Sequence, residues 1–136
     1  MSTRRSDLRM TAEATELSRA RRFVREAATG FGLHERATYE FVYAVNEAMT
    51  NAIKHGSTEH DGRIGVAIET DGDTLVCAVS DGGPFVPPTA YAGANLAESG
   101  RGFAFMSALT DELKLSVAAN ATVVRLCKRR VVSDGA

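Results

Sequence analysis

The chain has 136 residues, of which 44% are hydrophobic and 24% are charged, and its formal net charge at pH 7 is -1. These are ordinary values for one globular domain, and a charge so close to zero gives no reason to expect direct binding of nucleic acid. The sequence contains neither an apolar run of membrane-spanning length nor a signal-peptide pattern, so we expect no membrane association and a cytoplasmic protein.

Hydrophobic spacing predicts the elements of the fold in chain order. Apolar residues at every third or fourth position indicate helices, while alternating or continuous apolar runs between turn residues indicate strands. We expect a strand at 8–10, helices at 14–31 and 34–56, strands at 63–70 and 74–80, a helix at 103–109, and strands at 112–118 and 122–128. This order predicts an α+β two-layer sandwich, with a mixed, mainly antiparallel sheet and helices on one face. We expect a single domain over residues 1–136 with its core at about 8–128.

Turn residues support these boundaries. Gly32 follows the first helix and Gly56 ends the second, as is typical of helix C-termini. The sequence Asp-Gly-Asp at 71–73 separates two apolar runs and predicts the turn of a hairpin.

The two cysteines carry no sign of a metal site or a disulfide. Cys77 and Cys127 each stand alone in an apolar run, without CxxC or Cys/His spacing. We therefore expect both to be small core residues of a reduced protein.

Three polar residues recur at every fourth position of the second helix, within the sequence EAMTNAIKH. Glu47, Asn51 and His55 therefore share one face of a helix whose other positions are mostly apolar. Because burying an unpaired carboxylate or amide costs several kcal/mol, such a face requires a ligand, a metal or water. Taken alone, Glu47 and Asn51 also fit the solvent face of an ordinary amphipathic helix.

A second candidate segment, VSDGGPFVPP, begins where the strand at 74–80 ends. Asp81 can accept hydrogen bonds there, and Gly82 and Gly83 lack side chains that would keep a flat ring away from the backbone. Asp-Gly-Gly-Pro is also ordinary turn chemistry, so the segment alone does not decide between a turn and a binding site.

The segment GRGFAFM places two glycines at the expected start of the third helix. Backbone N–H groups of Gly100 and Gly102 would be exposed at such a start, where the aligned peptide dipoles favour an anion such as phosphate. Arg101 adds a positive charge. Glycines are common at helix starts, so an ordinary helix start explains the segment as well. The sequence has neither the P-loop pattern nor the GxGxxG dinucleotide pattern.

The ordered set of motifs resembles the ATP-binding fold shared by gyrase, heat-shock chaperones, sensor histidine kinases and mismatch-repair ATPases. EAMTNAIKHG is similar to the N box of that superfamily, DGGPF and GRGFAFM are similar to its two glycine boxes, and ATVVRL is similar to its last strand. The resemblance implies a Bergerat-type, histidine-kinase-like ATPase fold that binds ATP and Mg²⁺.

Within this superfamily, the chain is most similar to the small bacterial anti-sigma-factor serine/threonine kinases of the sporulation and general-stress type. The resemblance extends from Leu8 to Lys128. It implies a protein kinase that binds a sigma factor and phosphorylates an anti-sigma-factor antagonist, a STAS-type protein, in a partner switch that regulates transcription. It also implies a homodimer.

The resemblance implies roles for three residues of the helical layer. Asn51 corresponds to the asparagine that coordinates the magnesium ion bridging the ATP phosphates. Glu47 corresponds to the carboxylate proposed as the catalytic base for the acceptor serine. Arg21 falls where family members contact their protein partners. These roles agree with phosphoryl transfer, in which the protein mainly positions the reactants and neutralises negative charge.

The resemblance also implies how the nucleotide is held. Asp81 corresponds to the residue that reads the adenine amino group, Gly83 to the glycine beneath the base, and Thr122 to the threonine on the adenine side. The phosphate loop corresponds to Gly100, Arg101 and Gly102.

Two places depart from the family pattern. Pro84 and Phe85 follow Gly83 where many members have a second, spaced glycine, and Ala121 replaces the usual glycine before Thr122. These departures leave open a kinase-inactive or nucleotide-responsive module, in which the nucleotide only stabilises a partner-binding surface. A detached histidine-kinase catalytic domain, which would transfer phosphate to a histidine, is a third interpretation.

Overall fold

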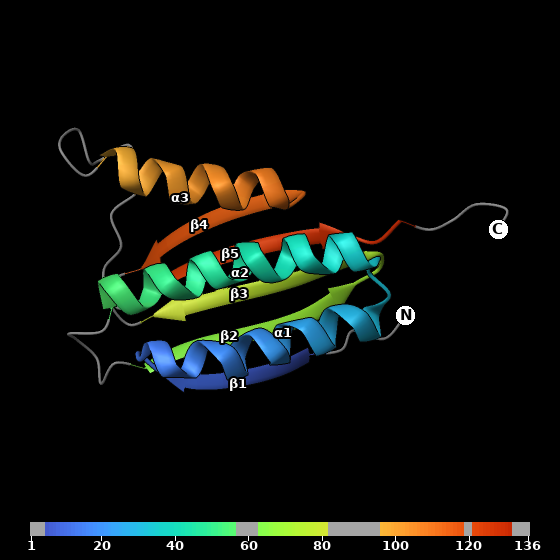
Figure 1. Cartoon of the computed structure of the whole chain (residues 1–136), viewed down its shortest axis with the longest axis horizontal. Helices are drawn as coiled ribbons and strands as arrows, with labels where there is room; N and C mark the ends of the chain where they lie inside the picture. Colours follow the sequence, from blue (N-terminus) through green and yellow to red (C-terminus); the bar gives the residue numbers. More distant parts are fainter. Residues whose placement is uncertain (1–4, 57–62, 82–95, 119–120, 132–136) are drawn as a thin grey trace, which may run out of the picture.

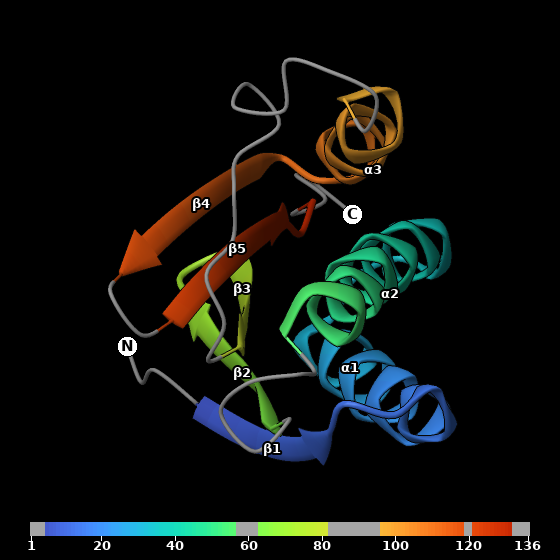
Figure 2. The ribbon, with the colours of Figure 1, turned by 90° about the vertical axis from the view of Figure 1, so that its left-hand side faces the viewer.

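The computed structural model describes residues 5–56, 63–81, 96–118 and 121–131. The elements are β1 (Arg5–Thr11), the short 3-10 helix η1 (Ala14–Glu16), α1 (Leu17–Phe31), α2 (Glu35–Gly56), β2 (Arg63–Asp71), β3 (Thr74–Asp81), α3 (Leu96–Leu109), β4 (Glu112–Ala118) and β5 (Ala121–Arg129). The strands form one five-stranded sheet in the order β1-β2-β3-β5-β4. Helices α1, α2 and α3 form a layer on one face of this sheet (Figures 1 and 2). The expected α+β fold is confirmed.

The direction of the strands differs from the expectation in one respect. All neighbouring strands of the described sheet are antiparallel, whereas the sequence analysis predicted a mixed sheet. The reason is that β4 lies at the outer edge, and β5 then returns between β4 and β3 in the direction opposite to both.

The hairpin of β2 and β3 has the turn that the sequence predicts. Asp71 pairs with Thr74, and Gly72 between them has a φ of 61°, in the left-handed region that glycine adopts without strain. This turn sets the register that puts Ile64, Val66 and Ile68 on the buried face of the sheet.

The first helix ends as expected at a glycine. Gly32 has a φ of 100°, and its N–H donates to the carbonyl oxygens of Ala28 at 3.2 Å and Thr29 at 3.1 Å. The left-handed residue satisfies carbonyls that the helix end leaves without a partner, and it turns the chain back so that α2 packs against α1.

The core lies between the sheet and the helices. Its largest fully buried side chains are those of Phe41, Met49, Ile64, Leu75, Met106 and Leu126. Cys77 belongs to this core, but Cys127 is only half-buried because the alternation of β5 turns it to the other face of the sheet. The prediction that both cysteines are core residues is therefore wrong for Cys127. Burial raises the pKa of both thiols.

Helix α3 begins earlier than the sequence analysis predicts. It starts at Leu96, so Gly100 and Gly102 lie inside the helix and not at its N-terminus. Leu, Ala and Glu are good helix formers and precede the glycine pair, and an interior glycine costs a helix only about 1 kcal/mol. None of the helices in the described part of the chain combines the length and apolar character needed to cross a bilayer.

Candidate functional site

Glu47 and Asn51 lie one turn apart on α2, on the side that faces α3. Both side chains are half-buried, in a helix whose neighbouring residues Ala48, Met49 and Ala52 are buried in the core. The pair is therefore neither in the apolar core nor on a free solvent face. It lies at the contact of two helices, where its polar atoms remain partly accessible to a ligand.

Gly102 brings the backbone of α3 against this pair. A Cβ atom at Gly102 would lie 3.1 Å from Glu47 Oε2 and 3.4 Å from Asn51 Nδ2. The first distance is shorter than most carbon–oxygen contacts, so only glycine fits here without displacing the carboxylate. Two motifs that are far apart in the sequence thus meet at Glu47, Asn51 and Gly102.

The anion site expected at the start of the third helix is not formed by the glycine pair. Because α3 begins at Leu96, the N–H groups from Gly100 onward bond to carbonyls one turn earlier in the same helix. Gly100 is part of the helix, and the side chain of Arg101 lies outside the described residues, as does Gly83. Gly102 lets the backbone of α3 approach Glu47 and Asn51 closely, but it offers no free N–H group to an anion.

Asp81 and Thr122 form a second polar pair, at the end of β3. They are register partners on neighbouring antiparallel strands. Asp81 is 7% exposed and Thr122 is 1% exposed, and each has a polar partner. A buried carboxylate beside a hydroxyl offers both acceptors and a donor, which is the chemistry needed to recognise a flat heterocycle with a polar edge.

The two pairs lie at the same end of the molecule. Helix α2 and strand β3 end there, and β5 and α3 begin there, at the left in Figure 1. The topology therefore gathers the carboxylate and amide of α2, the close approach of α3 and the Asp81–Thr122 pair at one edge of the sandwich. The side chain of His55, the third member of the polar stripe, lies outside the described residues.

A metal bound here would need ligands beyond the protein. Among the described residues, no group of three or more His, Cys, Asp or Glu side chains is arranged to hold a metal ion. Asn51 offers one amide oxygen, and Mg²⁺ commonly takes one or two protein ligands and completes its shell with phosphate and water oxygens. The donor set therefore fits a magnesium ion that arrives with a phosphate-bearing ligand.

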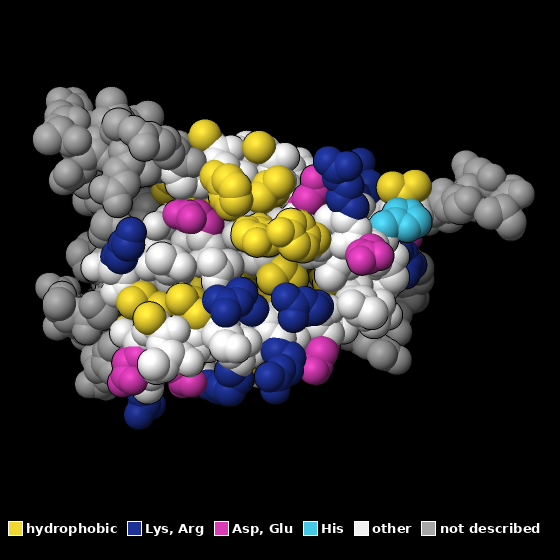
Figure 3. Space-filling view, in the orientation of Figure 1, with side chains coloured by type: hydrophobic (Ala, Val, Ile, Leu, Met, Phe, Trp, Pro, Cys, Tyr) yellow, Lys and Arg dark blue, Asp and Glu magenta, His cyan; other side chains and the backbone are white. Residues whose placement is uncertain are grey.

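A separate groove runs between α1 and α2 on the outer face of the helical layer. It has a volume of about 750 Å³ and is lined by Arg21, Arg25, Tyr39, Tyr43 and Asn46 among others. Arg21 Nη1 donates to Asn46 Oδ1 at 3.1 Å, and the hydroxyl of Tyr39 donates to that of Tyr43 at 3.0 Å. Figure 3 shows the basic side chains of α1 directly beside hydrophobic side chains of α2.

Of the residues that line this groove, only Arg21 was predicted from the sequence. The sequence did contain a sign of this groove, because Tyr39 and Tyr43 lie four residues apart on the polar side of a helix. Exposed aromatic side chains are uncommon at such positions. Tyrosine and arginine are both enriched at protein interfaces.

Comparisons with known proteins agree with this architecture. A profile of the histidine kinase-like ATPase domain matches residues 10–128. The chain is also similar to a crystal structure of the RsbU and RsbW domains of Rv1364c from Mycobacterium tuberculosis, with 25% sequence identity and a TM-score of 0.69. That match covers 94% of this chain and 35% of the other, so this chain spans about a third of its length. A comparison with curated protein sequences found no match.

Proposed function

The chain belongs to the histidine kinase-like ATPase domain family, and on that premise we propose that it is an ATP-dependent serine/threonine protein kinase acting as an anti-sigma factor. It binds a sigma factor and phosphorylates a STAS-type antagonist, whose phosphorylation state decides whether the sigma factor is held. The similarity over 94% of the chain to a structure with an RsbW domain supports this proposal. A cytoplasmic homodimer, without direct contacts to nucleic acid or membrane, is part of the same proposal.

The observation that carries the proposal is the meeting of Glu47, Asn51 and Gly102. When bound, magnesium ATP would supply the phosphoryl group, and the Asn51 amide oxygen would be the protein ligand of the metal. Glu47 orients the acceptor hydroxyl and accepts its proton. Gly102 leaves room for both side chains because it has no Cβ. Such a division of roles suits phosphoryl transfer, where positioning and charge neutralisation dominate.

Asp81 and Thr122 would hold the adenine ring. A carboxylate oxygen of Asp81 would accept a hydrogen bond from the exocyclic amino group of adenine, whereas guanine presents a carbonyl oxygen at the same position. The buried position of the pair, away from competing water, strengthens this discrimination. Gly83, Gly100 and Arg101 remain proposed parts of the nucleotide site, and Gly102 contributes to it through its close approach to Glu47 and Asn51 rather than through a free N–H group.

We expect Asp81→Asn to weaken ATP binding by about 10-fold to 100-fold, the usual cost of losing a charge-assisted hydrogen bond. The amide nitrogen that replaces one oxygen can donate to a guanine carbonyl, so the preference for ATP over GTP falls with it. Isothermal titration calorimetry with both nucleotides and Mg²⁺ measures the change. Asp71→Asn, at an exposed turn residue, is the matched control. Unchanged nucleotide preference in Asp81→Asn would contradict the role of Asp81.

The groove between α1 and α2 is the proposed partner-binding surface of which Arg21 is part. Two arginines, Arg21 and Arg25, outnumber the one carboxylate of the groove, Glu35, and lie beside two exposed aromatic rings. Leu33 and Val42 form an apolar floor. These features suit a protein segment with acidic and apolar side chains. At such interfaces, a few aromatic and arginine side chains contribute most of the binding free energy.

We therefore expect Tyr43→Ala and Arg21→Ala each to weaken partner binding by at least about 10-fold, the usual effect at an interface hot spot. The measurement is the dissociation constant for the sigma factor or the antagonist that co-purifies with the wild-type chain. Arg125→Ala, at an exposed position on the face of the sheet opposite the helices, serves as the control. Equal affinities for all variants would place the partner elsewhere.

The product formed with magnesium ATP separates the kinase from the two other interpretations. A kinase-inactive module binds nucleotide or partner without transferring phosphate, and the departures at Pro84, Phe85 and Ala121 are the reason to test it. A histidine-kinase catalytic domain would give an acid-labile phosphohistidine. The proposed kinase gives acid-stable phosphoserine or phosphothreonine.

A further inference from the structure

The C-terminal half of helix α3, residues 102–109, has a narrow apolar contact with the rest of the molecule. Among its described side-chain positions, Gly102 and Met106 are buried and Phe103 and Leu109 are half-buried, while the positions between them are exposed. With so few buried apolar side chains, residues 102–109 gain little energy from packing alone. The position of this half of α3 over α2 therefore also depends on the contacts at its C-terminal end.

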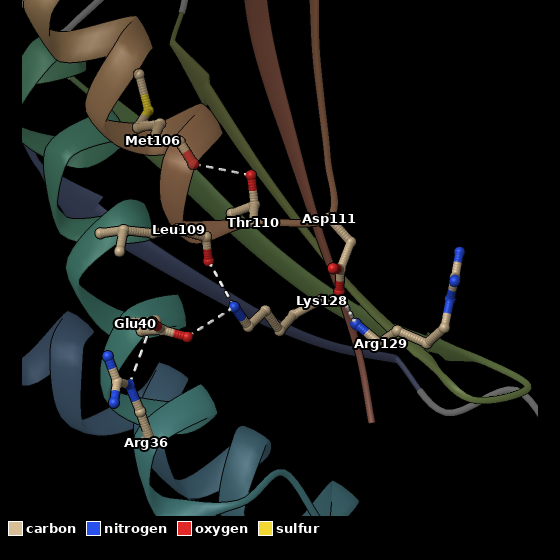
Figure 4. Close-up of polar contacts among 8 residues, drawn as sticks. All are labelled: Arg36, Glu40, Met106, Leu109, Thr110, Asp111, Lys128 and Arg129. Atoms are coloured by element: carbon tan, nitrogen blue, oxygen red, sulfur yellow. Dashed lines mark hydrogen bonds and ion pairs between the residues drawn. The ribbon is translucent and has the colours of Figure 1, made fainter. Parts of the chain in front are cut away.

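The C-terminal end of α3 is held by a lysine from β5. Lys128 Nζ donates to the carbonyl oxygen of Leu109, the last residue of α3, at 2.8 Å and to Glu40 Oε1 of α2 at 3.0 Å. Figure 4 shows this one ammonium group between the two helices. The Lys128 side chain is only 12% exposed, so water competes weakly for these bonds. A cation at a helix C-terminus also interacts favourably with the helix dipole and with a carbonyl that lacks a helical partner.

Neighbouring contacts fasten the turn after α3 to the same strand. Asp111 Oδ2 accepts from the backbone N–H of Arg129 at 2.6 Å, and the Asp111 N–H donates to the Cys127 carbonyl at 2.8 Å. Arg36, which is 91% exposed, approaches the other Glu40 oxygen at 3.7 Å and adds little. Lys128 thus joins α2, α3 and β5 through one ammonium group.

We propose that Lys128 is a positioning residue that fixes α3 so that Gly102 stays against Glu47 and Asn51; this inference rests on the proposed kinase function. About two helical turns, or about 10 Å, separate Gly102 from the held end at Leu109. A tilt of about 10° at that end moves Gly102 by about 2 Å, and a misplacement of about 1 Å can cost a reaction about 100-fold. The lysine acts through the helix and touches neither substrate nor nucleotide.

The test compares Lys128→Met with Lys128→Arg. The methionine fills the same space but cannot donate, while arginine can reach both acceptors. We expect Lys128→Met to lower kcat by at least about 10-fold with a smaller change in the KM for ATP, and to speed amide hydrogen exchange in α3 by at least about 10-fold. We expect Lys128→Arg to keep most of the wild-type kcat and most of the wild-type protection of α3 from exchange. Lys114→Met is the matched control, because Lys114 is 69% exposed and pairs with Glu112 at 3.1 Å on the same sheet.

Hydrogen exchange separates this inference from the kinase proposal. Faster exchange confined to α3 supports positioning by Lys128 even if no phosphoryl transfer is found, in which case the kinase proposal fails alone. Exchange that accelerates equally in α1 and α3 means a general loss of stability and overturns the inference. So does wild-type behaviour of Lys128→Met in both measurements. If Lys128→Met does not fold, Glu40→Gln removes the charge of the partner carboxylate and is judged by the same outcomes.

Discussion

We expect Glu47→Gln to lower the rate of phosphoryl transfer by about 100-fold to 10,000-fold, the range typical of a lost general base. Glutamine has the same size and keeps an oxygen near the acceptor hydroxyl, but it does not take up the proton. Because Glu47 lies at the contact of α2 with α3 and not in the core, the fold should be retained. The measurement is single-turnover transfer from magnesium ATP to the antagonist.

The control for this prediction is Glu69→Gln. Glu69 is also half-buried, but it lies on β2, next to Ile68 and therefore on the opposite face of the sheet. We expect Glu69→Gln to transfer phosphate at the wild-type rate, and both variants to bind magnesium ATP within about threefold of wild type. A Glu47→Gln variant as fast as its control would remove Glu47 from the mechanism.

The second large effect is expected for Asn51→Ala. Without the amide, magnesium ATP loses its protein-bound metal ligand, and we expect its dissociation constant to rise by at least about 10-fold to 100-fold. In EDTA, where no metal is bound, the variant and the wild-type chain should bind ATP equally weakly. Calorimetry in the two conditions measures the difference.

Asn46→Ala is a close control for Asn51→Ala. Both asparagines are half-buried on α2, but Asn46 faces α1, where its Oδ1 accepts from Arg21. We expect Asn46→Ala to leave binding of magnesium ATP unchanged. An Asn51→Ala variant that keeps the full effect of Mg²⁺ on ATP affinity would mean that the metal is held by other residues.

Local patterns were sufficient to predict most of the fold. The hairpin of β2 and β3 was predicted within one residue at each end, because its strands alternate or run apolar and its turn carries glycine where a left-handed residue is needed. Helix α2 was predicted within one residue because its apolar stripe is long. Each of these signals is a property of neighbouring residues.

The features that the sequence could not predict depend on contacts between distant residues. The start of α3 was missed because glycines at Gly100 and Gly102 look locally like a helix boundary, whereas the structure uses Gly102 for close approach to α2. No local pattern states that β3 pairs with β5, yet this pairing alone puts Asp81 opposite Thr122. In the sequence, Lys128 is likewise one of several basic residues in the last strand. Its two acceptors, Glu40 and the Leu109 carbonyl, come near it only when the helices pack on the sheet.

The central claim is that this chain transfers phosphate from ATP to a serine or threonine of a partner protein, with Glu47 as the base. The most direct measurement is phosphoamino-acid analysis of the proteins that co-purify with the chain, after incubation with radiolabelled magnesium ATP. The account predicts acid-stable phosphoserine or phosphothreonine on a partner with the wild-type chain, and almost none with Glu47→Gln. Acid-labile phosphohistidine, or no labelled partner while ATP is bound, would contradict it.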